Sequence, residues 1–192
     1  SRLNQKVVFP AKTMIAAAMN PCKCGFFPDL GKCRCTPTQI RRYLNRVSGP
    51  FLDRIDIGVE VPRQDLGMMT AEKSIDEGSF PQTERRDSSA VMRARVMEAR
   101  ARQEIRFAGE SISYNSQMTR RQIEEYCRLS GEDAVFLEKV ERQQGISARG
   151  HGKILKVART LADLDGQAEI GRTQLAEAIG FRSFEKKYWG SL

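Results

Sequence analysis

Four of the five cysteines lie close together and are the clearest candidates for chemistry. Cys22, Cys24, Cys33 and Cys35 form two Cys-X-Cys pairs separated by eight residues. A disulfide within Cys-X-Cys closes a very small loop with poor geometry, whereas four thiolates complete a tetrahedral zinc site. Because Cys-X-Cys is tighter than the usual two-residue gap, a structural zinc ion and free thiols both remain open. Cys127 stands alone in a helical segment and is predicted to be a small core residue.

Two polar residues stand at the borders of apolar segments. Asn20 follows the apolar run 13–19 and precedes Pro21, so it is either a turn residue or an amide at the carboxyl end of a strand, where α/β sheets bind ligands. Arg54 lies between Asp53 and Asp56. It is either part of a surface ion pair of little energetic value or an arginine offered to the phosphate of another subunit.

Arg149 breaks a local rule of helix chemistry. Ser147 is a natural N-cap, which places Arg149 in the first helical turn, where a cation opposes the helix dipole. Gly150 and Gly152 in the same turn lower helix propensity further. A helix N-terminus with an arginine forms an anion site, and the alternative is an exposed arginine that tolerates its position.

The elements expected to position these residues change in kind along the chain. Short apolar or alternating segments predict strands at 6–9, 13–19 and 55–61. A helix starts at Thr36, with Pro37 and a capping box completed by Gln39, and stops at Gly49-Pro50. Further helices are predicted from Ser88 or Ser89 to about 105, at 117–128, at 132–143, from Ser147 to about 164 and at 172–180.

The predicted inward faces of two helices follow from apolar spacing. In the helix that starts at Ser88 or Ser89, these residues are Ala90, Ala94, Met97, Ala101 and Ile105. In the helix that starts at Ser147, they are Ile154, Leu155, Ala158, Leu161 and Ala162. The fold class is therefore the edge of an α/β layer followed by an all-helical bundle, mainly helical overall.

Charge favours a polyanionic partner. The chain carries 32 basic and 24 acidic residues, a net charge of +8, and residues 1–60 carry ten basic and four acidic residues, a net +6. Arg41, Arg42 and Arg46 lie away from the apolar face of the helix that starts at Thr36, so they are the predicted nucleic-acid contacts. Charge alone leaves nucleic acid and nucleotide phosphates both open as the polyanion.

Several classes of protein are excluded or disfavoured. The chain has no P-loop, one histidine and no Ser/His/Asp set, so we expect no complete enzyme within these residues. It has no apolar run of about 20 residues and no signal peptide, so we expect a cytoplasmic protein with no membrane partner. The start at Ser1 favours a piece of a longer protein.

The combined motifs resemble those of magnesium-chelatase-like AAA+ ATPases, and in particular the competence protein ComM (YifB) group. Residues 16–25 (Ala-Ala-Ala-Met-Asn-Pro-Cys-Lys-Cys-Gly) are similar to the sensor-1 segment of that family. The similarity continues at 33–37, 41–44, 48–50, 52–56, 147–149 and 155–164, which covers nearly the whole chain except the connector 65–87. Residues 150–152 (Gly-His-Gly) depart from the Ala-Tyr-His that is usual in the family after the sensor-2 arginine.

The resemblance implies a role for each candidate residue. Asn20 takes the sensor-1 position, Arg54 the arginine-finger position, which serves the nucleotide of a neighbouring subunit, and Arg149 the sensor-2 position, which usually serves its own subunit. It also implies three parts: residues 1–64 as the C-terminal part of the AAA+ ATPase core with the cysteine loop 20–36, residues 65–87 as a linker, and residues 88–192 as the helical lid domain.

The function implied by the resemblance is that of a hexameric ATPase using ATP with Mg. Its P-loop lies upstream of Ser1, and it acts on DNA as a branch-migration helicase in natural transformation. Two alternatives remain open: a magnesium-chelatase motor that remodels a partner protein, and a zinc-containing binding module without catalysis. By itself, a chain without the P-loop is expected to be inactive.

Overall fold

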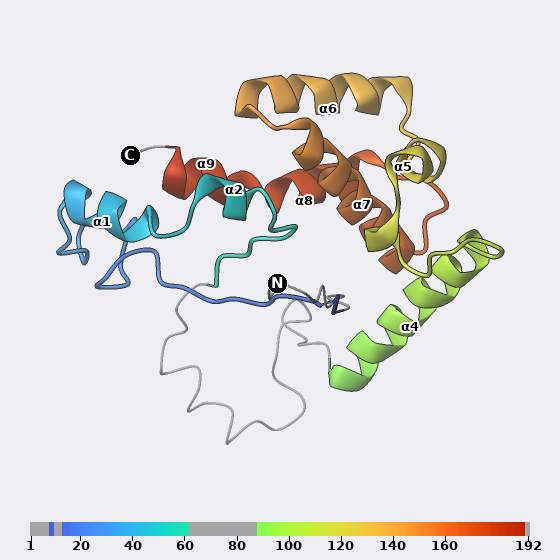
Figure 1. Ribbon diagram of the computed structural model, residues 1–192, viewed down its shortest axis with the longest axis horizontal. Helices are drawn as coiled ribbons and strands as arrows, with labels where there is room; N and C mark the ends of the chain where they lie inside the picture. Colours follow the sequence, from blue (N-terminus) through green and yellow to red (C-terminus); the bar gives the residue numbers. More distant parts are fainter. Residues whose placement is uncertain (1–7, 10–12, 62–87, 191–192) are drawn as a thin grey trace, which may run out of the picture. The chain divides into compact units, whose positions relative to one another are not determined.

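The computed structural model describes residues 8–9, 13–61 and 88–190, and this part of the chain is mainly helical (Figure 1). Its helices are α1 (Pro37–Leu44), α2 (Gly49–Leu52), α4 (Ser89–Arg106), the 3₁₀ helix η2 (Asn115–Gln117), α5 (Arg120–Tyr126), α6 (Gly131–Gln144), α7 (Ala148–Leu164), α8 (Arg172–Gly180) and α9 (Ser183–Trp189). The chain divides into two compact units, residues 1–46 and 47–192. None of the described helices is long and apolar enough to cross a membrane.

The division into units bears on the predicted domains. Residues 47–61 belong to the same compact unit as helices α4 to α9. The linker predicted at 65–87 lies outside the described residues. The domain boundaries at 64 and 88 therefore stay predictions for the intact protein.

Helix α1 begins as its sequence predicts. Thr36 Oγ1 accepts a hydrogen bond from the Gln39 amide at 3.3 Å, and Gln39 Oε1 accepts one from the Thr36 amide at 3.0 Å. Ile40 and Leu44 bury its apolar face. The helix ends at Leu44, earlier than predicted, and Pro50 lies in the first turn of α2 instead of ending α1.

The predicted strands are not formed where the structure describes them. Residues 13–19 and 55–61 have no regular secondary structure, and residues 6–7 of the third predicted strand are outside the described part. A strand needs a hydrogen-bonded neighbour, and no described segment provides one. The apolar side chains stay exposed as a result: Met14 is 93% and Val61 88% accessible.

The helical part of the prediction is confirmed in its order and its caps. Ser88 Oγ accepts from the Val91 amide at 3.4 Å and Ser147 Oγ from the Gly150 amide at 3.1 Å, so both serines are N-caps. Helix α9 was not predicted, because Ser183–Trp189 is mostly polar and lacks apolar periodicity.

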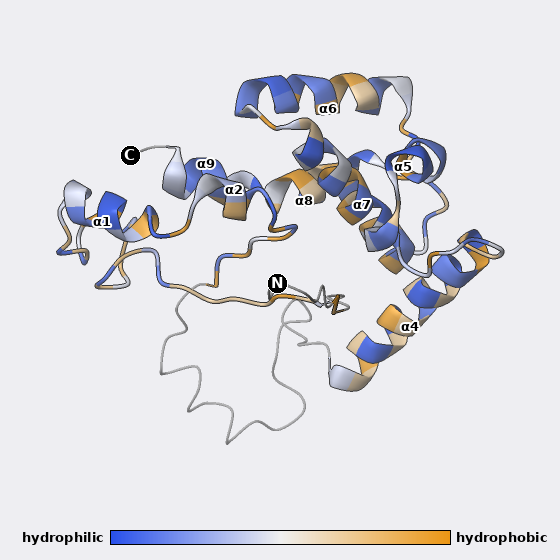
Figure 2. Ribbon diagram, in the orientation of Figure 1, coloured by the Kyte–Doolittle hydropathy of each residue, from blue (hydrophilic) through white to orange (hydrophobic). Residues whose placement is uncertain are grey.

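Helix α7 is the centre of the second unit, where it contacts α4, η2, α5 and α8 (Figure 1). Four of its five predicted inward residues are buried: Ile154, Leu155, Ala158 and Ala162. Leu161 is partly buried against the same core. Both α7 and α8 carry their apolar residues where they meet (Figure 2).

Helix α4 does not use the inward face that its apolar residues predict. Ala99 and Gln103 are buried instead, while Met97 is 57% and Ile105 78% exposed. Arg102 donates to the Asp163 carbonyl at 3.1 Å, so α4 approaches α7 through its arginines. A cation at the carboxyl end of α7 satisfies a free carbonyl and complements the helix dipole. Polar contacts, and not apolar spacing, therefore decide how α4 is oriented.

A buried ionic network joins α4, η2 and α7 around Asp163, which is fully buried. Both of its carboxylate oxygens bind Arg106, one of them at 2.8 Å. Asn115 Nδ2 donates to it at 2.8 Å, and Arg159 lies 3.2 Å away. Arg159 in turn donates to the carbonyl of Gln167 at 2.7 Å. One carboxylate thus compensates a buried arginine, Arg159, and a partly buried one, Arg106.

Replacing Asp163 by Asn is expected to lower the free energy of unfolding of the chain by about 3–5 kcal/mol, because it leaves Arg106 and Arg159 without their counter-charge in the interior. Urea unfolding followed by circular dichroism measures this loss. Glu138→Gln is the control, since Glu138 forms an exposed ion pair with Arg142 that contributes little. A loss below about 1 kcal/mol for Asp163→Asn would contradict the importance of the network.

Candidate functional site

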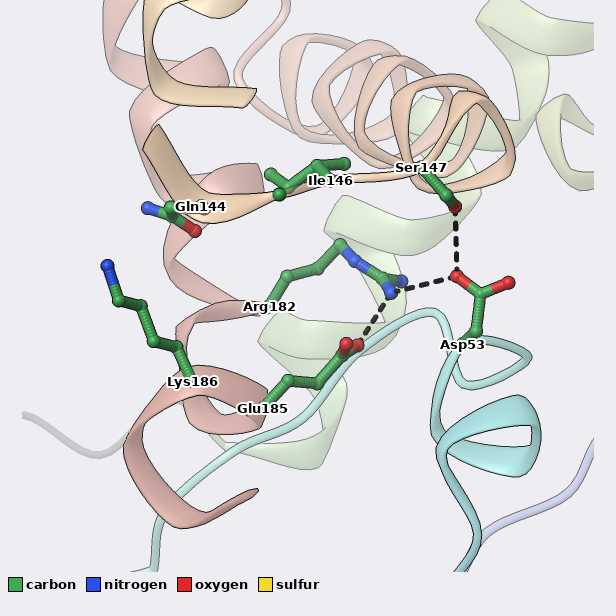
Figure 3. Close-up of a pocket in the computed structure, with 8 residues that line it drawn as sticks. Asp53, Gln144, Ile146, Ser147, Arg182, Glu185 and Lys186 are labelled. Atoms are coloured by element: carbon green, nitrogen blue, oxygen red, sulfur yellow. Dashed lines mark hydrogen bonds and ion pairs between the residues drawn. The ribbon is translucent and has the colours of Figure 1, made fainter. Parts of the chain in front are cut away.

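The N-terminal end of α7 forms the centre of the candidate site. Gly145 closes α6 with φ = 69°, a left-handed conformation that favours glycine, and this turn leads directly to the Ser147 cap of α7. These residues line a cavity of about 110 Å³ (Figure 3). Its lining consists of residues 144–147, Asp53, Arg182, and Glu185 and Lys186 of α9.

Asp53 is the residue on which the polar groups of this site converge (Figure 3). Ser147 Oγ donates to Asp53 Oδ1 at 3.2 Å. Arg182 Nη2 lies 3.7 Å from the same oxygen, and Arg149 Nη1 lies 3.6 Å from Asp53 Oδ2. The carboxylate therefore stands at the positive end of the α7 dipole, where an anion is favoured. The anion site predicted at this helix terminus thus faces a carboxylate of the same chain.

Arg149 lies in the first turn of α7, as predicted, and its side chain is 61% exposed. Its contact with Asp53 offsets the unfavourable position of a cation at a helix N-terminus. Because more than half of the Arg149 side chain is exposed, its guanidinium retains donors for a further anion.

Arg54 does not form an ion pair with Asp53 or Asp56, which was the alternative interpretation of this residue. Its exposed side chain donates from Nη1 to the Pro50 carbonyl in its own loop. The two neighbouring carboxylates have other partners: Asp53 contacts Arg149 and Arg182, and Asp56 binds Lys153 at 2.8 Å. The guanidinium of Arg54 is thereby left at the surface with donors available.

Two of residues 150–152 of α7, Gly150 and His151, have contacts with the end of α6 and the turn that follows it. Gly150 is buried, and a Cβ at this position would lie 2.7 Å from Ile146 Cγ2, so a larger residue requires Ile146 to move. His151 Nδ1 lies 2.7 Å from Glu141 Oε1 on α6. His151 therefore joins α6 to α7, which accounts for it by structure alone.

The four clustered cysteines meet in the first unit. Their sulfur atoms all lie within 4.8 Å of one another, with Cys22 Sγ 3.3 Å from Cys24 Sγ and 3.8 Å from Cys33 Sγ. A tetrahedral zinc ion with Zn–S bonds of about 2.3 Å requires sulfur atoms about 3.8 Å apart. All four are free thiols in the structure, as is Cys127, which is buried in the core of the second unit as predicted.

Backbone amides prepare part of the cluster for a cation. Backbone amides donate hydrogen bonds that lower the pKa of Cys24 to about 6, and the largest contribution comes from Phe26. The pKa of Cys33 is raised to about 12: the Cys35 amide works against the shift, but desolvation, the hydrogen bonds with Cys24 and Cys22 and the charge of Cys22 outweigh it. Four thiolates cannot form side by side without a compensating charge, so the donor set fits a divalent metal ion.

The other predicted site residues of the first unit are at its surface. Asn20 is exposed and lies in a segment without regular structure. Arg41 and Arg42 are exposed in the last turn of α1, and Arg46 is exposed beyond its end. The structure brings the cysteines together as one cluster and links Arg149 to the loop of Arg54.

Sequence reasoning missed Asp53 and Arg182 as parts of the site. Asp53 was considered only as an ion-pair partner of Arg54, and Arg182 had no local signal at all. Their contact spans positions 129 apart in the chain, which no short-range pattern reveals.

Two family comparisons cover most of the chain. Residues 86–182 match the family "Magnesium chelatase, subunit ChlI C-terminal", and residues 1–69 match "Magnesium chelatase, subunit ChlI". Together the two matches include the cysteine cluster and, at the second site, Asp53, Ser147, Arg149 and Arg182.

Individual relatives cover the chain almost completely. The chain is 42% identical to competence protein ComM of Haemophilus influenzae in an alignment that covers 95% of the chain. It is 39% identical to the uncharacterised protein YifB of Escherichia coli K12 in an alignment that covers 97% of the chain. An uncharacterised protein of Mycobacterium tuberculosis is 30% identical over 91% of the chain. The chain spans about one third of the length of these relatives. Since one family match alone includes half of its residues, the chain belongs to the magnesium chelatase ChlI family, with its similarity to ComM and YifB extending from end to end.

Proposed function

We propose that the chain is part of a ring-forming AAA+ ATPase that couples the hydrolysis of ATP, bound with Mg, to the remodelling of DNA. The observation that carries this proposal is the contact of Arg149 with Asp53, next to Arg54. The residues that the resemblance places at the finger and sensor-2 positions are thus joined through Asp53, the neighbour of Arg54 in sequence, and both side chains are exposed. Exposed guanidinium groups can stabilise the charge that develops in phosphoryl transfer.

The α/β edge of the ATPase core is part of the same proposal. The exposed apolar residues of 13–19 and 55–61 fit segments that pair with strands of a longer protein. Relatives three times the length of the chain supply room for such strands and for a P-loop. In that setting Asn20 would lie at the end of a strand, where a sensor-1 amide orients the attacking water.

Zinc has a structural role in this proposal. Cys22, Cys24, Cys33 and Cys35 would hold one ion with all four positions filled, which leaves no open position for catalysis. The ion would cross-link the loop that leads into α1 at Thr36.

The DNA contact is proposed on the surface of the first unit. Residues 13–46 carry six basic residues and one acidic residue, and Arg41, Arg42 and Arg46 are exposed. Side chains of this kind bind phosphates and release counterions. One relative is named a competence protein, and the proposed activity of the whole protein is that of a branch-migration helicase in natural transformation.

Reversing the three charges (Arg41→Glu, Arg42→Glu, Arg46→Glu) is expected to weaken DNA binding by the full-length protein. Each lost phosphate contact lowers the slope of log K against log salt concentration by about 0.9, so the slope falls by as much as about 2.7. Fluorescence anisotropy with labelled duplexes over a salt series measures both quantities. The control is reversal of Arg120, Arg121 and Arg142, which are exposed on α5 and α6. Equal effects of the two triple variants would contradict the assignment.

A magnesium-chelatase motor acting on a partner protein is the second candidate, because both family matches carry that name. Stimulation of ATP hydrolysis by DNA separates the two. A DNA motor is expected to hydrolyse ATP faster when DNA is added, whereas a chelatase-type motor is expected to respond to its protein partner and not to DNA.

A further inference from the structure

Arg182 is a buried arginine to which the proposed function assigns no role. It lies between α8, which ends at Gly180, and α9, which begins at Ser183. Its side chain is 5% exposed. Burying an arginine costs free energy unless its donors are satisfied, so its partners indicate what it holds.

The partners of Arg182 lie on both sides of Arg54. Arg182 Nη1 donates to the Ile55 carbonyl at 2.9 Å, and Nη2 lies 3.7 Å from Asp53 Oδ1. Glu185, 2.6 Å from Nη2, supplies the local counter-charge (Figure 3). One planar guanidinium therefore contacts the residue before Arg54 and the residue after it.

Other contacts hold the same loop against the helices. Lys153 on α7 donates to the Arg54 carbonyl and binds Asp56. The Gly58 amide donates to the Phe181 carbonyl at 2.9 Å. The Phe184 ring covers Gly58 so closely that a Cβ there would lie 2.2 Å from it. The backbone on both sides of Arg54 is thus attached to α7 and to the α8–α9 junction, while the Arg54 side chain stays exposed.

We propose that Arg182 is the positioning residue of the Arg54 finger: it holds the backbone of residues 53–55 against the lid so that the Arg54 guanidinium is presented in a fixed place. This inference rests on the proposed function, in which Arg54 serves a nucleotide phosphate. A displacement of about 1 Å at a catalytic group costs on the order of 10²-fold in rate. Because Arg182 lies at the end of the lid, it also makes the finger dependent on the position of α8 and α9.

Arg182→Gln in the full-length protein tests this inference with two separate measurements. ATP turnover is expected to fall about 10²-fold while the affinity for ATP is unchanged. Hydrogen–deuterium exchange of residues 53–58 is expected to rise, because the Ile55 carbonyl and Asp53 lose their partner. Arg182→Lys, which keeps the charge but lacks the planar fork of donors, is the second variant if Arg182→Gln does not fold, and its effects should have the same direction.

Arg172→Gln is the matched control, because Arg172 also pairs with a carboxylate, Asp133, but at the other end of α8. It should leave turnover and exchange of residues 53–58 unchanged. In an Arg54→Ala background, Arg182→Gln is expected to cause no further loss, since the group that it positions is gone.

The outcomes distinguish the inference from the proposed function. If Arg54→Ala abolishes turnover but the Arg182 variants keep it, Arg182 does not position the finger and the proposed function stands. An additive loss in the double variant also overturns the inference. If Arg54→Ala itself leaves turnover intact, the finger assignment fails, and the catalytic role of Arg182 fails with it, whatever the exchange of residues 53–58 shows.

Discussion

Replacing Arg54 by Ala in the full-length protein is expected to reduce ATP turnover on the order of 10³-fold or more and to leave ATP affinity nearly unchanged. The physical reason is that a finger acts on charge that develops in the transition state and not on the bound nucleotide. Steady-state kinetics together with equilibrium binding of a labelled nucleotide separate the two quantities. Arg142→Ala, which removes an exposed arginine of α6, is the control.

Mixing subunits tests whether Arg54 acts on a neighbour's nucleotide. Arg54→Ala subunits can still bind ATP, and subunits that cannot bind ATP still carry Arg54. If the finger acts between subunits, a mixture of the two variants regains turnover, because each supplies what the other lacks. If mixed rings form and no activity returns, Arg54 is not a finger acting on its neighbour.

The same mixture gives a sharper expectation for Arg149. A sensor-2 arginine was expected to serve its own subunit, but Arg149 contacts Asp53, the residue next to Arg54. Because Arg149 is held at the residue next to Arg54 and both arginines are exposed, we expect Arg149→Ala to be rescued by mixing as Arg54→Ala is. Arg149→Ala should also weaken nucleotide binding. Rescue of Arg54→Ala without rescue of Arg149→Ala would show that the two arginines serve different nucleotides.

The helix starts were predictable from sequence because their causes are local. Thr36, Ser88 and Ser147 each cap a helix through a hydrogen bond to an amide three residues away. The capping side chain and the amide that donates to it therefore both lie within a window of four residues. The spacing of apolar residues on α7 was sufficient for the same reason, since that helix is enclosed by several neighbours and buries an apolar face.

The strands and the orientation of α4 were not predictable, because their causes are distant in sequence. Residues 55–61 alternate between apolar and polar side chains, yet alternation yields a strand only beside a partner strand. The inward face of α4 is decided by Asp163, a carboxylate 57 positions away from Arg106. The Asp53–Arg182 contact likewise joins two residues that are distant in sequence. The candidate arginines were therefore recognisable from sequence, whereas the groups that position them were not.

Removing the proposed zinc site is expected to lower the stability of the first unit strongly, which is the second large effect that we predict. Purified under reducing conditions without chelator, the full-length protein should contain about one equivalent of zinc. A structural zinc site contributes on the order of 10 kcal/mol or more of apparent binding free energy, which is also folding free energy. The first unit has a small apolar core around Ile40 and Leu44, so the metal would be a large part of what holds its loop.

Cys22→Ser is the variant with the largest expected consequence, because Cys22 is the fully buried member of the cluster. It should lose the metal, and hydrogen–deuterium exchange of residues 22–44 should rise while that of α7 stays as it was. Cys127→Ser is the control: Cys127 lies in the core of the second unit, outside the cluster, so its replacement should keep one equivalent of zinc. Metal analysis well below one equivalent in the reduced unmodified protein would instead leave Cys22, Cys24, Cys33 and Cys35 as free thiols. The cohesion of the loop before α1 would then depend on its hydrogen bonds, among them those that backbone amides donate to Cys22 and Cys24 and those that Asp29 accepts.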